Sequence, residues 1–159
     1  HAPGSVGCMV ITCSDTRTPE TDTSGQLIRK LLEERGHTVV GHHLVKDDPA
    51  QIQLWIARAT TNEAVQALIV NGGTGISRRD STFEAVDAML EKRLPGFGEI
   101  FRLLTYQEMG SPAIMSRATA GIIKGRVLFS IPGSEQAVRL AMEKLILPEL
   151  GHLVQQLSK

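Results

Sequence analysis

Short apolar runs alternate with stretches of helical periodicity along the chain. Four of these runs have the length and composition of strands, and they cover Val6–Cys13, His37–Val45, Ala67–Val70 and Arg126–Ile131. Between them, apolar residues recur every three or four positions, as on one face of a helix. Strands separated by helices are typical of βαβ units. We therefore expect an α/β fold with a mostly parallel sheet and helices on both of its faces.

The expected helices have recognisable ends. The first begins at Ser24 and stops before Gly36, because glycine is favoured just past a helix C-terminus. The second is expected to start at Asp48-Pro49, with the aspartate as N-cap and the proline in the first turn. In the third, Ser81 and Glu84 have the spacing of a capping box, which would give both side chains a structural role.

The second half of the chain carries weaker signals. Pro95-Gly96 is expected to break the chain, and the apolar positions from Ile100 to Leu104 indicate a short helix after it. Pro148 is expected to divide the C-terminal helical region in two.

Loops beginning at Ser14, Asp47, Gly72 and Pro132 each follow a predicted strand. The carboxyl ends of parallel strands meet at one edge of a sheet, and ligands of such folds bind outside that edge. The predicted topology therefore brings these four loops together before any motif is considered.

Composition narrows the class of protein. The chain has 159 residues, of which 42% are apolar and 21% charged. This length and composition suit one domain, which we place at residues 5–157. Lys and Arg number 17, as do Asp and Glu, so the net charge is zero and no nucleic-acid partner is expected.

No apolar stretch reaches the roughly 18 residues of a membrane helix, and the chain does not open on a signal-peptide pattern. We expect a cytoplasmic protein without a membrane partner.

Two pairs of residues are excluded as metal or disulfide sites. Cys8 and Cys13 lie an odd number of positions apart in one strand, so their side chains face opposite sides of the sheet. We expect both to be reduced core residues. His42 and His43 are adjacent and point apart for the same reason, so no shared metal site is expected.

A glycine-rich loop is the most informative motif. Gly72-Gly73-Thr74-Gly75 follows a buried strand, and Arg78, Arg79 and Asp80 come directly after it. Glycines let a phosphate approach backbone N–H groups closely, and arginines add planar donors. The motif is not a P-loop, because no Gly-Lys-Ser/Thr follows at the required distance. Nor is it a dinucleotide fingerprint, because Arg78 stands where a small residue is needed. It predicts an anion-binding loop.

Two aspartates near this edge have no evident structural role. Asp48 is expected to cap a helix, which leaves Asp47 free, and Asp80 lies just outside the predicted capping box. Two free carboxylates on neighbouring loops would suffice to hold Mg²⁺ together with water and phosphate oxygens.

For three further segments the sequence alone does not decide between a structural and a functional role. The stretch Ser14-Asp15-Thr16-Arg17-Thr18 offers hydroxyls, an acid and an arginine, but it equally suits a simple turn. Ser134 is a candidate N-cap, and it also opens a helix where an anion can bind. Ser116-Arg117 has no structural signature.

Taken in order, these segments resemble the MoaB/MogA family of molybdenum-cofactor biosynthesis proteins, which includes the gephyrin G domain. The resemblance spans nearly the whole chain. It rests on Ser14-Asp15, Asp22-x-Ser24-Gly25, Asp47-Asp48, Gly72-Gly73-Thr74-Gly75 with Arg78-Arg79-Asp80, Pro95-Gly96-Phe97-Gly98-Glu99, Tyr106-Gln107-Glu108-Met109-Gly110, Ser116-Arg117-Ala118 and Pro132-Gly133-Ser134.

The resemblance implies a fold, an assembly and an activity. Members of the family adopt a three-layer α/β/α sandwich and form homo-oligomers, either trimers or hexamers. Active members transfer AMP from Mg·ATP to the terminal phosphate of molybdopterin and release pyrophosphate. ATP and molybdopterin would thus be the substrates, Mg²⁺ the cofactor, and other proteins of molybdenum cofactor biosynthesis further partners.

The resemblance also assigns roles to residues of this sequence. Asp47 and Asp80 would be the catalytic acids and would hold Mg²⁺. The substrate-binding residues would be Ser14, Asp15, Gly72, Gly73, Thr74, Gly75, Arg79, Glu99, Ser116, Arg117, Pro132, Gly133 and Ser134.

Two other functions use the same features. A carrier protein would hold molybdopterin in the same pocket without adenylylating it, and an oligomeric scaffold would need neither acid. The glycine loop with Asp47 and Asp80 favours the enzyme, because a scaffold has no use for that set of residues.

Overall fold

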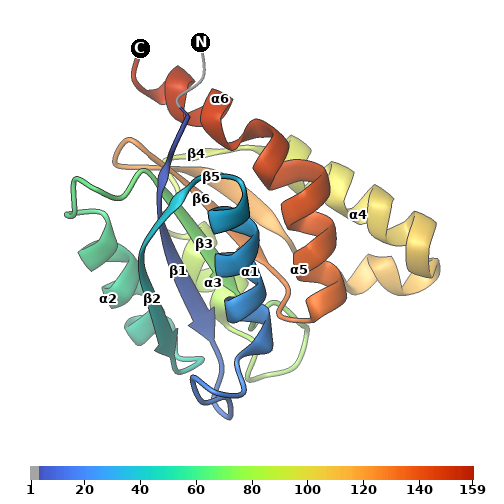
Figure 1. Ribbon diagram of the computed structural model, residues 1–159. Coiled ribbons are helices and arrows are strands. Elements are labelled where there is room, and N and C mark those ends of the chain that lie inside the picture. The colour runs from blue at the N-terminus through green and yellow to red at the C-terminus, as the bar shows by residue number, and fades with distance from the viewer. Residues whose placement is uncertain (1–3) are drawn as a thin grey trace.

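The computed structural model describes residues 4–159, so the start of the chain, where no signal-peptide pattern was found, lies outside the described residues. Six strands form one sheet in the order β2-β1-β3-β6-β5-β4 (Figure 1). Their bounds are Gly7–Cys13 (β1), Thr38–Val45 (β2), Ala67–Asn71 (β3), Lys92–Arg93 (β4), Thr119–Ile123 (β5) and Arg126–Ile131 (β6).

The sheet is mostly parallel, which confirms the predicted α/β fold. β1 pairs in parallel with β2 and β3, and β3 pairs in parallel with β6. β5 runs antiparallel to both β6 and β4. Neither β4 nor β5 was predicted. β4 has only two residues, and the first three residues of β5 are Thr119, Ala120 and Gly121, which lack the bulky apolar side chains that mark a strand.

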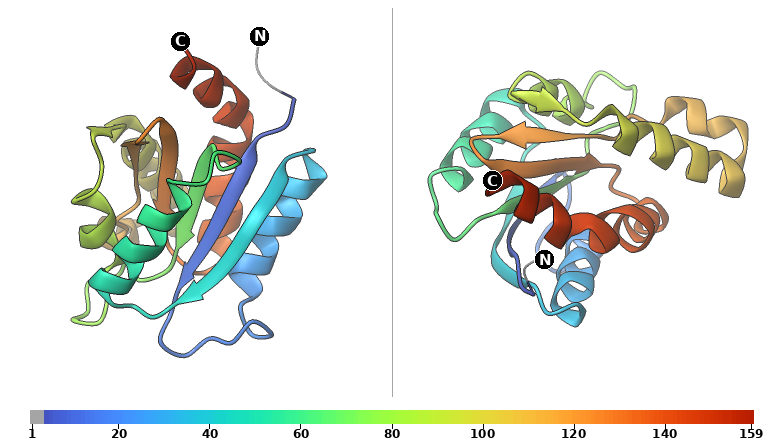
Figure 2. Two further views of the ribbon diagram at one scale, coloured as in Figure 1. Left: turned by 90° about the vertical axis from the view of Figure 1, so that its left-hand side faces the viewer. Right: turned by 90° about the horizontal axis from the view of Figure 1, so that it is seen from above.

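Helices cover both faces of the sheet, as expected for three layers (Figures 1 and 2). They are α1 (Thr23–Glu34), α2 (Pro49–Ala59), α3 (Thr82–Asp87), α4 (Pro95–Met109), a 3₁₀ helix η1 (Ser111–Met115), α5 (Glu135–Ala141), a π-helix η2 (Met142–Ile146) and α6 (Leu147–Leu157). One apolar cluster packs α1, α4, α5 and α6 against the sheet, and a second packs α2 and α3 against its other face.

The two cysteines confirm the alternation of β1. Cys8 belongs to the first cluster and Cys13 to the second, and both are free and buried. Burial raises the pKa of each thiol to about 12. Neither thiol is therefore a nucleophile near neutral pH.

The expected break at Pro95-Gly96 and the short helix after it were wrong. Pro95 lies in the first turn of α4, where its missing N–H costs no hydrogen bond, and the helix continues for 15 residues. α4 and η1 extend away from the other helices (Figure 2). Because part of α4 has no core to face, its apolar residues do not follow the pattern of a simple buried stripe.

The C-terminal region remains helical on both sides of Pro148. The N–H of Leu147 bonds to the carbonyl of Met142, the wider spacing of a π-helix, immediately before the proline. The expected division is therefore a change of helical type and not a gap. Among the described residues, no helix combines the length and apolar character needed to cross a membrane.

Candidate active site

A cavity of about 730 Å³ lies at the carboxyl ends of the parallel strands. The loops after β1, β2, β3 and β6 all contribute to its lining, through Ser14, Asp47, Gly72 and Pro132 among others. The volume is in the range of small-molecule sites. The convergence predicted from topology is thus what the structure shows.

Most of the predicted site residues line this cavity, and three do not. Ser14, Asp15, Asp47, Gly72, Gly73, Thr74, Gly75, Asp80, Ser116, Pro132, Gly133 and Ser134 are part of the lining. Arg79 instead forms an ion pair with Asp15 from an exposed position. Arg117 lies behind the glycine loop, and Glu99 is exposed on α4.

Asp47 is not free of structural duty, contrary to expectation. Its Oδ1 accepts hydrogen bonds from the Ser81 N–H at 3.2 Å and the Ser81 hydroxyl at 2.8 Å, so it caps the start of α3. Its own N–H donates to Asp15 Oδ1 at 3.0 Å, which joins the loops after β1 and β2. Asp47 Oδ2 makes no hydrogen bond within the described residues and lies close to Gly73, in a residue that lines the cavity.

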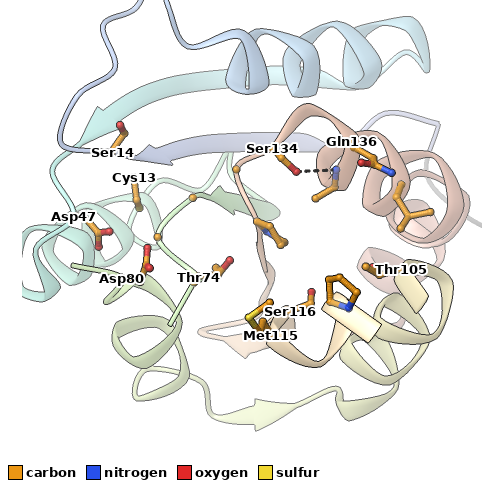
Figure 3. A pocket seen from close by; sticks show the side chains of 18 of the residues that line it. Cys13, Ser14, Asp47, Thr74, Asp80, Thr105, Met115, Ser116, Ser134 and Gln136 are labelled. Carbon is orange, nitrogen blue, oxygen red and sulfur yellow. Dashed lines mark hydrogen bonds between the residues drawn. The ribbon is translucent and has the colours of Figure 1, made fainter. Parts of the chain in front are cut away.

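Asp80 is held in a similar way by its own loop. Its Oδ2 accepts hydrogen bonds from the N–H of Ser77 at 3.0 Å and from the Ser77 hydroxyl at 2.7 Å. Its Oδ1 has no partner within residues 4–159. Each acid is therefore oriented through one oxygen and presents the other. In Figure 3 both carboxylates lie on the same side of the cavity, below Ser14 and Cys13.

The predicted capping box is wrong. Ser81 makes no side-chain bond to the α3 backbone, because its hydroxyl goes to Asp47. Glu84 pairs instead with Arg117, whose guanidinium lowers the pKa of that carboxyl. Arg117 also donates to the carbonyls of Thr74 and Gly75. It thus fixes the glycine loop from behind.

The three glycines of the loop have no room for a side chain. Gly72 and Gly73 have φ values of +96° and +67°, which other residues rarely adopt. A Cβ on Gly73 would overlap Thr82 Oγ1 and come within 2.8 Å of Asp47 Oδ2. A Cβ on Gly75 would lie 2.6 Å from Asp80 Oδ2. The two acids therefore lie directly against the loop, one near each end.

The other end of the cavity was missed by sequence reasoning. It is formed by residues of α4, η1 and α5, which are Phe101, Thr105, Glu108, Met109, Pro112, Met115, Gln136, Ala137 and Leu140. In Figure 3, Thr105, Met115 and Gln136 lie opposite Asp47 and Asp80. The Ser116 hydroxyl is buried there and has no partner in the described chain. The apolar residues among them look like core in a sequence. Glu108 and Met109 belong to the stretch Tyr106–Gly110, which supported the family resemblance but was given no role in the site.

A buried aspartate supports the loop after β1. Asp22 is 1% exposed, caps α1 through the Gly25 N–H, and bonds to His42 Nε2 at 3.0 Å. Burial raises the pKa of Asp22, but hydrogen bonds from His42, Thr12 and Gly25 outweigh that and hold the pKa below its usual value. Ser134 was a candidate N-cap, and its hydroxyl does cap α5 by accepting a hydrogen bond from the Ala137 N–H.

The donor set fits Mg²⁺ only in part. Among the described residues no three His, Cys, Asp or Glu side chains are grouped to hold a metal ion. Of the two predicted acids, Asp47 Oδ2 and Asp80 Oδ1 are the oxygens without a hydrogen-bond partner in the described residues. Mg²⁺ commonly takes one or two carboxylates and completes its shell with water and substrate phosphates. The site thus suits a metal that arrives with a phosphate ligand, and does not suit a protein-enclosed one.

Fold and site together define an α/β protein with a small-molecule pocket, lined by a glycine loop and acidic side chains, at the edge of a mostly parallel sheet. Residues 9–152 match the family described as "Probable molybdopterin binding domain", and the chain belongs to this family. Molybdenum cofactor biosynthesis protein B of Halalkalibacterium halodurans is 54% identical over 160 residues, which cover all of this chain and 94% of that protein. The protein of the same name from Bacillus subtilis is 53% identical, with coverage of 100% and 94%.

Solved structures agree with this membership. A crystal structure of molybdenum cofactor biosynthesis protein B has a TM-score of 0.96 at 53% identity and covers 99% of both chains. The tungsten cofactor synthesizing protein MoaB from Pyrococcus furiosus has a TM-score of 0.88 at 36% identity, covering 99% of this chain and all of that one. The resemblance to MoaB/MogA proteins is thereby confirmed.

Proposed function

We propose that this protein acts in molybdenum cofactor biosynthesis by transferring AMP from Mg·ATP to the terminal phosphate of molybdopterin, with release of pyrophosphate. The family supports molybdopterin as the ligand. The observation that carries the catalytic part is the pair Asp47 and Asp80, which both lie against the glycine loop and are each fixed through one oxygen, while the other oxygen has no partner within the described residues.

The reaction needs positioning more than proton transfer. An anionic oxygen of the molybdopterin phosphate forms a bond to the α-phosphorus of ATP. The bond from that phosphorus to the oxygen bridging toward the β-phosphate breaks, and pyrophosphate leaves with the electron pair. The attacking oxygen carries no proton to remove, so no general base is required. This agrees with the described lining of the cavity, which holds no histidine and in which burial raises the pKa of the Cys13 thiol to about 12.

The residues of the chain would divide the work by position. Asp47 and Asp80 would hold Mg²⁺, which when bound neutralises charge on the triphosphate and on departing pyrophosphate. The N–H groups of Gly73, Thr74 and Gly75 make no hydrogen bond within the described residues and would bind phosphate oxygens. The Gly72 N–H, in contrast, already bonds to the carbonyl of Ile131. Arg117 would keep that loop in place through the carbonyls of Thr74 and Gly75.

Pyrophosphate release tests this proposal directly. Wild type and Asp80→Asn are compared with Mg·ATP, in the presence and absence of molybdopterin. We expect molybdopterin-dependent release in wild type and a loss of about 10²-fold or more in the variant. Asp87→Asn is the control, because Asp87 is an aspartate paired with Arg93 and does not line the cavity. Full activity in Asp80→Asn would refute the assignment.

The carrier function gives a different result in the same assay. A carrier binds molybdopterin in this cavity but releases no pyrophosphate above the background of ATP hydrolysis. If the wild type binds molybdopterin at equilibrium but releases no pyrophosphate, the protein is a carrier and not an enzyme.

An exposed apolar stripe supports self-association. Ile100, Leu103, Tyr106 and Met109 recur at three-residue spacing along α4, and η1 adds Ile114, which is 85% exposed. Large exposed apolar patches mark interaction surfaces. The projection of α4 and η1 from the rest of the molecule makes this stripe accessible to a second copy (Figure 2). A homo-oligomer, trimer or hexamer, would cover it.

A further inference from the structure

The cavity is poor in positive charge for a site that takes phosphates. Within residues 4–159 its lining includes the acids Asp15, Asp47, Asp80 and Glu108, and Arg17 as its single Lys or Arg side chain. Two arginines nearby are engaged elsewhere, Arg79 with Asp15 and Arg117 with Glu84 and loop carbonyls. Among the described lining residues, Arg17 is therefore the one side chain whose charge attracts an anion that enters without its own cation.

Arg17 is held at its place by two acceptors. One Nη2–H donates to the carbonyl of Gly133 at 3.0 Å, and Nη1 lies 3.5 Å from Asp22 Oδ1. Asp22 is itself fixed by His42 and by the start of α1. The protein itself thus fixes the guanidinium before any ligand arrives. Less side-chain entropy is therefore lost when Arg17 binds a ligand.

The guanidinium keeps donors in reserve. An arginine has five N–H donors, and two serve Gly133 and Asp22. The others make no hydrogen bond in the described part of the chain, and the Arg17 side chain is 31% exposed. Gly133 is packed against Gly72, since a Cβ there would lie 3.1 Å from Gly72 Cα and 3.7 Å from Arg17 Nη1. Arg17 therefore stands beside the glycine loop at its β6 side.

We infer that Arg17 binds the terminal phosphate of molybdopterin, the acceptor of the proposed transfer. This assignment rests on the proposed function. The triphosphate brings Mg²⁺, whose charge Asp47 and Asp80 can share, so it does not depend on Arg17 for charge compensation. The acceptor phosphate carries no obligatory metal, and the lining offers one cation for it. The planar fork of arginine suits phosphate oxygens two at a time.

Binding measured without metal and nucleotide isolates this contact. Wild type, Arg17→Gln, Arg17→Lys and Arg93→Gln are titrated with molybdopterin and with its dephosphorylated form, in EDTA and without ATP, following pterin fluorescence. Arg93 is the matched control, because it is also held by an aspartate and a backbone carbonyl, both of Asp87, but does not line the cavity.

The ratio of the two dissociation constants is the quantity to compare. We expect wild type and Arg93→Gln to bind the phosphorylated form about 10- to 100-fold more tightly, as for a charge-assisted hydrogen bond. The ratio should fall toward one in Arg17→Gln and be intermediate in Arg17→Lys, which keeps the charge without the fork. Urea unfolding checks that each variant folds. If Arg17→Gln does not, the reduced ratio in Arg17→Lys decides.

Several outcomes would overturn the inference. An unchanged ratio in Arg17→Gln, or an equal loss for both forms, would leave Arg17 only the role of fixing the Gly133 loop. Absence of any phosphate preference in wild type would refute it as well. Failure of the proposed activity appears differently: a ratio that depends on Arg17, with no pyrophosphate release, keeps the phosphate site and makes the protein a carrier.

Discussion

The Ser81 hydroxyl donates a 2.8 Å hydrogen bond to Asp47 Oδ1, so an acid that follows β2 is fixed by the residue that opens α3. The two residues are 34 positions apart in the chain. This bond gives Asp47 a structural role beside its proposed catalytic one. Asp80, by contrast, bonds only to Ser77 within its own exposed loop.

Replacing Asp47 should therefore destabilise the fold more than replacing Asp80, although we expect both variants to lose activity. We expect Asp47→Asn to lower the free energy of unfolding by about 1–2 kcal/mol, because the donors at the start of α3 lose a charged acceptor. Asp80→Asn should change it by less, about 0.5 kcal/mol, because its two donors both belong to Ser77 in an exposed loop. Urea unfolding of both variants measures the difference. Equal stability of the two would show that the Asp47 cap contributes nothing.

Gly73 should tolerate no side chain. Gly73→Ala adds an overlap with Thr82 to the strain of a positive φ, and we expect a loss of about 3 kcal/mol in unfolding free energy. Gly125→Ala is the control, because Gly125 has a φ of +77° and no atom within 4 Å of the added Cβ. It should cost about 1 kcal/mol. A similar loss in both would mean that only the backbone conformation matters.

Asp22 should make stability depend on pH in the acid range. Its lowered pKa means that ionised Asp22 stabilises the fold above its unfolded-state pKa, and that this contribution disappears as the pH falls through the folded-state pKa. We expect Asp22→Asn to be about 1–3 kcal/mol less stable at neutral pH. The gap should narrow below about pH 4.

Urea unfolding from neutral pH down to about pH 3 follows that gap. Asp48→Asn, at the exposed N-cap of α2, is the control and should stay close to wild type throughout. A gap of constant size at every pH would contradict the role given to the Asp22 charge.

Leu103 tests the apolar stripe of α4. Leu103→Glu places a charge on a surface that would be buried between copies, so we expect the oligomer to dissociate to monomers at micromolar concentration. Leu54→Glu is the matched control, since Leu54 is an exposed leucine on α2, away from the stripe. Sedimentation velocity gives the molecular mass of each. A monomeric wild type would remove self-association from the proposal.

The topology and the position of the site could be read from the sequence because they depend on local patterns. The run Ala67–Val70 is apolar at every position, so its burial on both faces was evident, and the glycine loop follows it directly. Asp48 and Pro49 likewise carry their helix start in adjacent residues, and the structure confirms both.

Interactions between distant residues could not be read in this way. Glu84 has the spacing of a local capping box, but Arg117, which lies 33 positions further on, offers a full charge and competes successfully for its carboxylate. Arg17 sits in a stretch that equally suits a simple turn. Only the folded chain shows that Gly133, 116 positions away, holds it beside the cavity.

The cavity is built from loops that follow four different strands, so its parts meet only when the whole sheet has formed. A ligand that binds this folded state and not the unfolded one adds RT ln(1 + [L]/Kd) to stability, about 2.7 kcal/mol at a hundredfold excess over Kd. Proteases act mainly on chains that have opened. An occupied molecule therefore outlives an empty one, and the supply of ligand helps to set how much of this protein a cell retains.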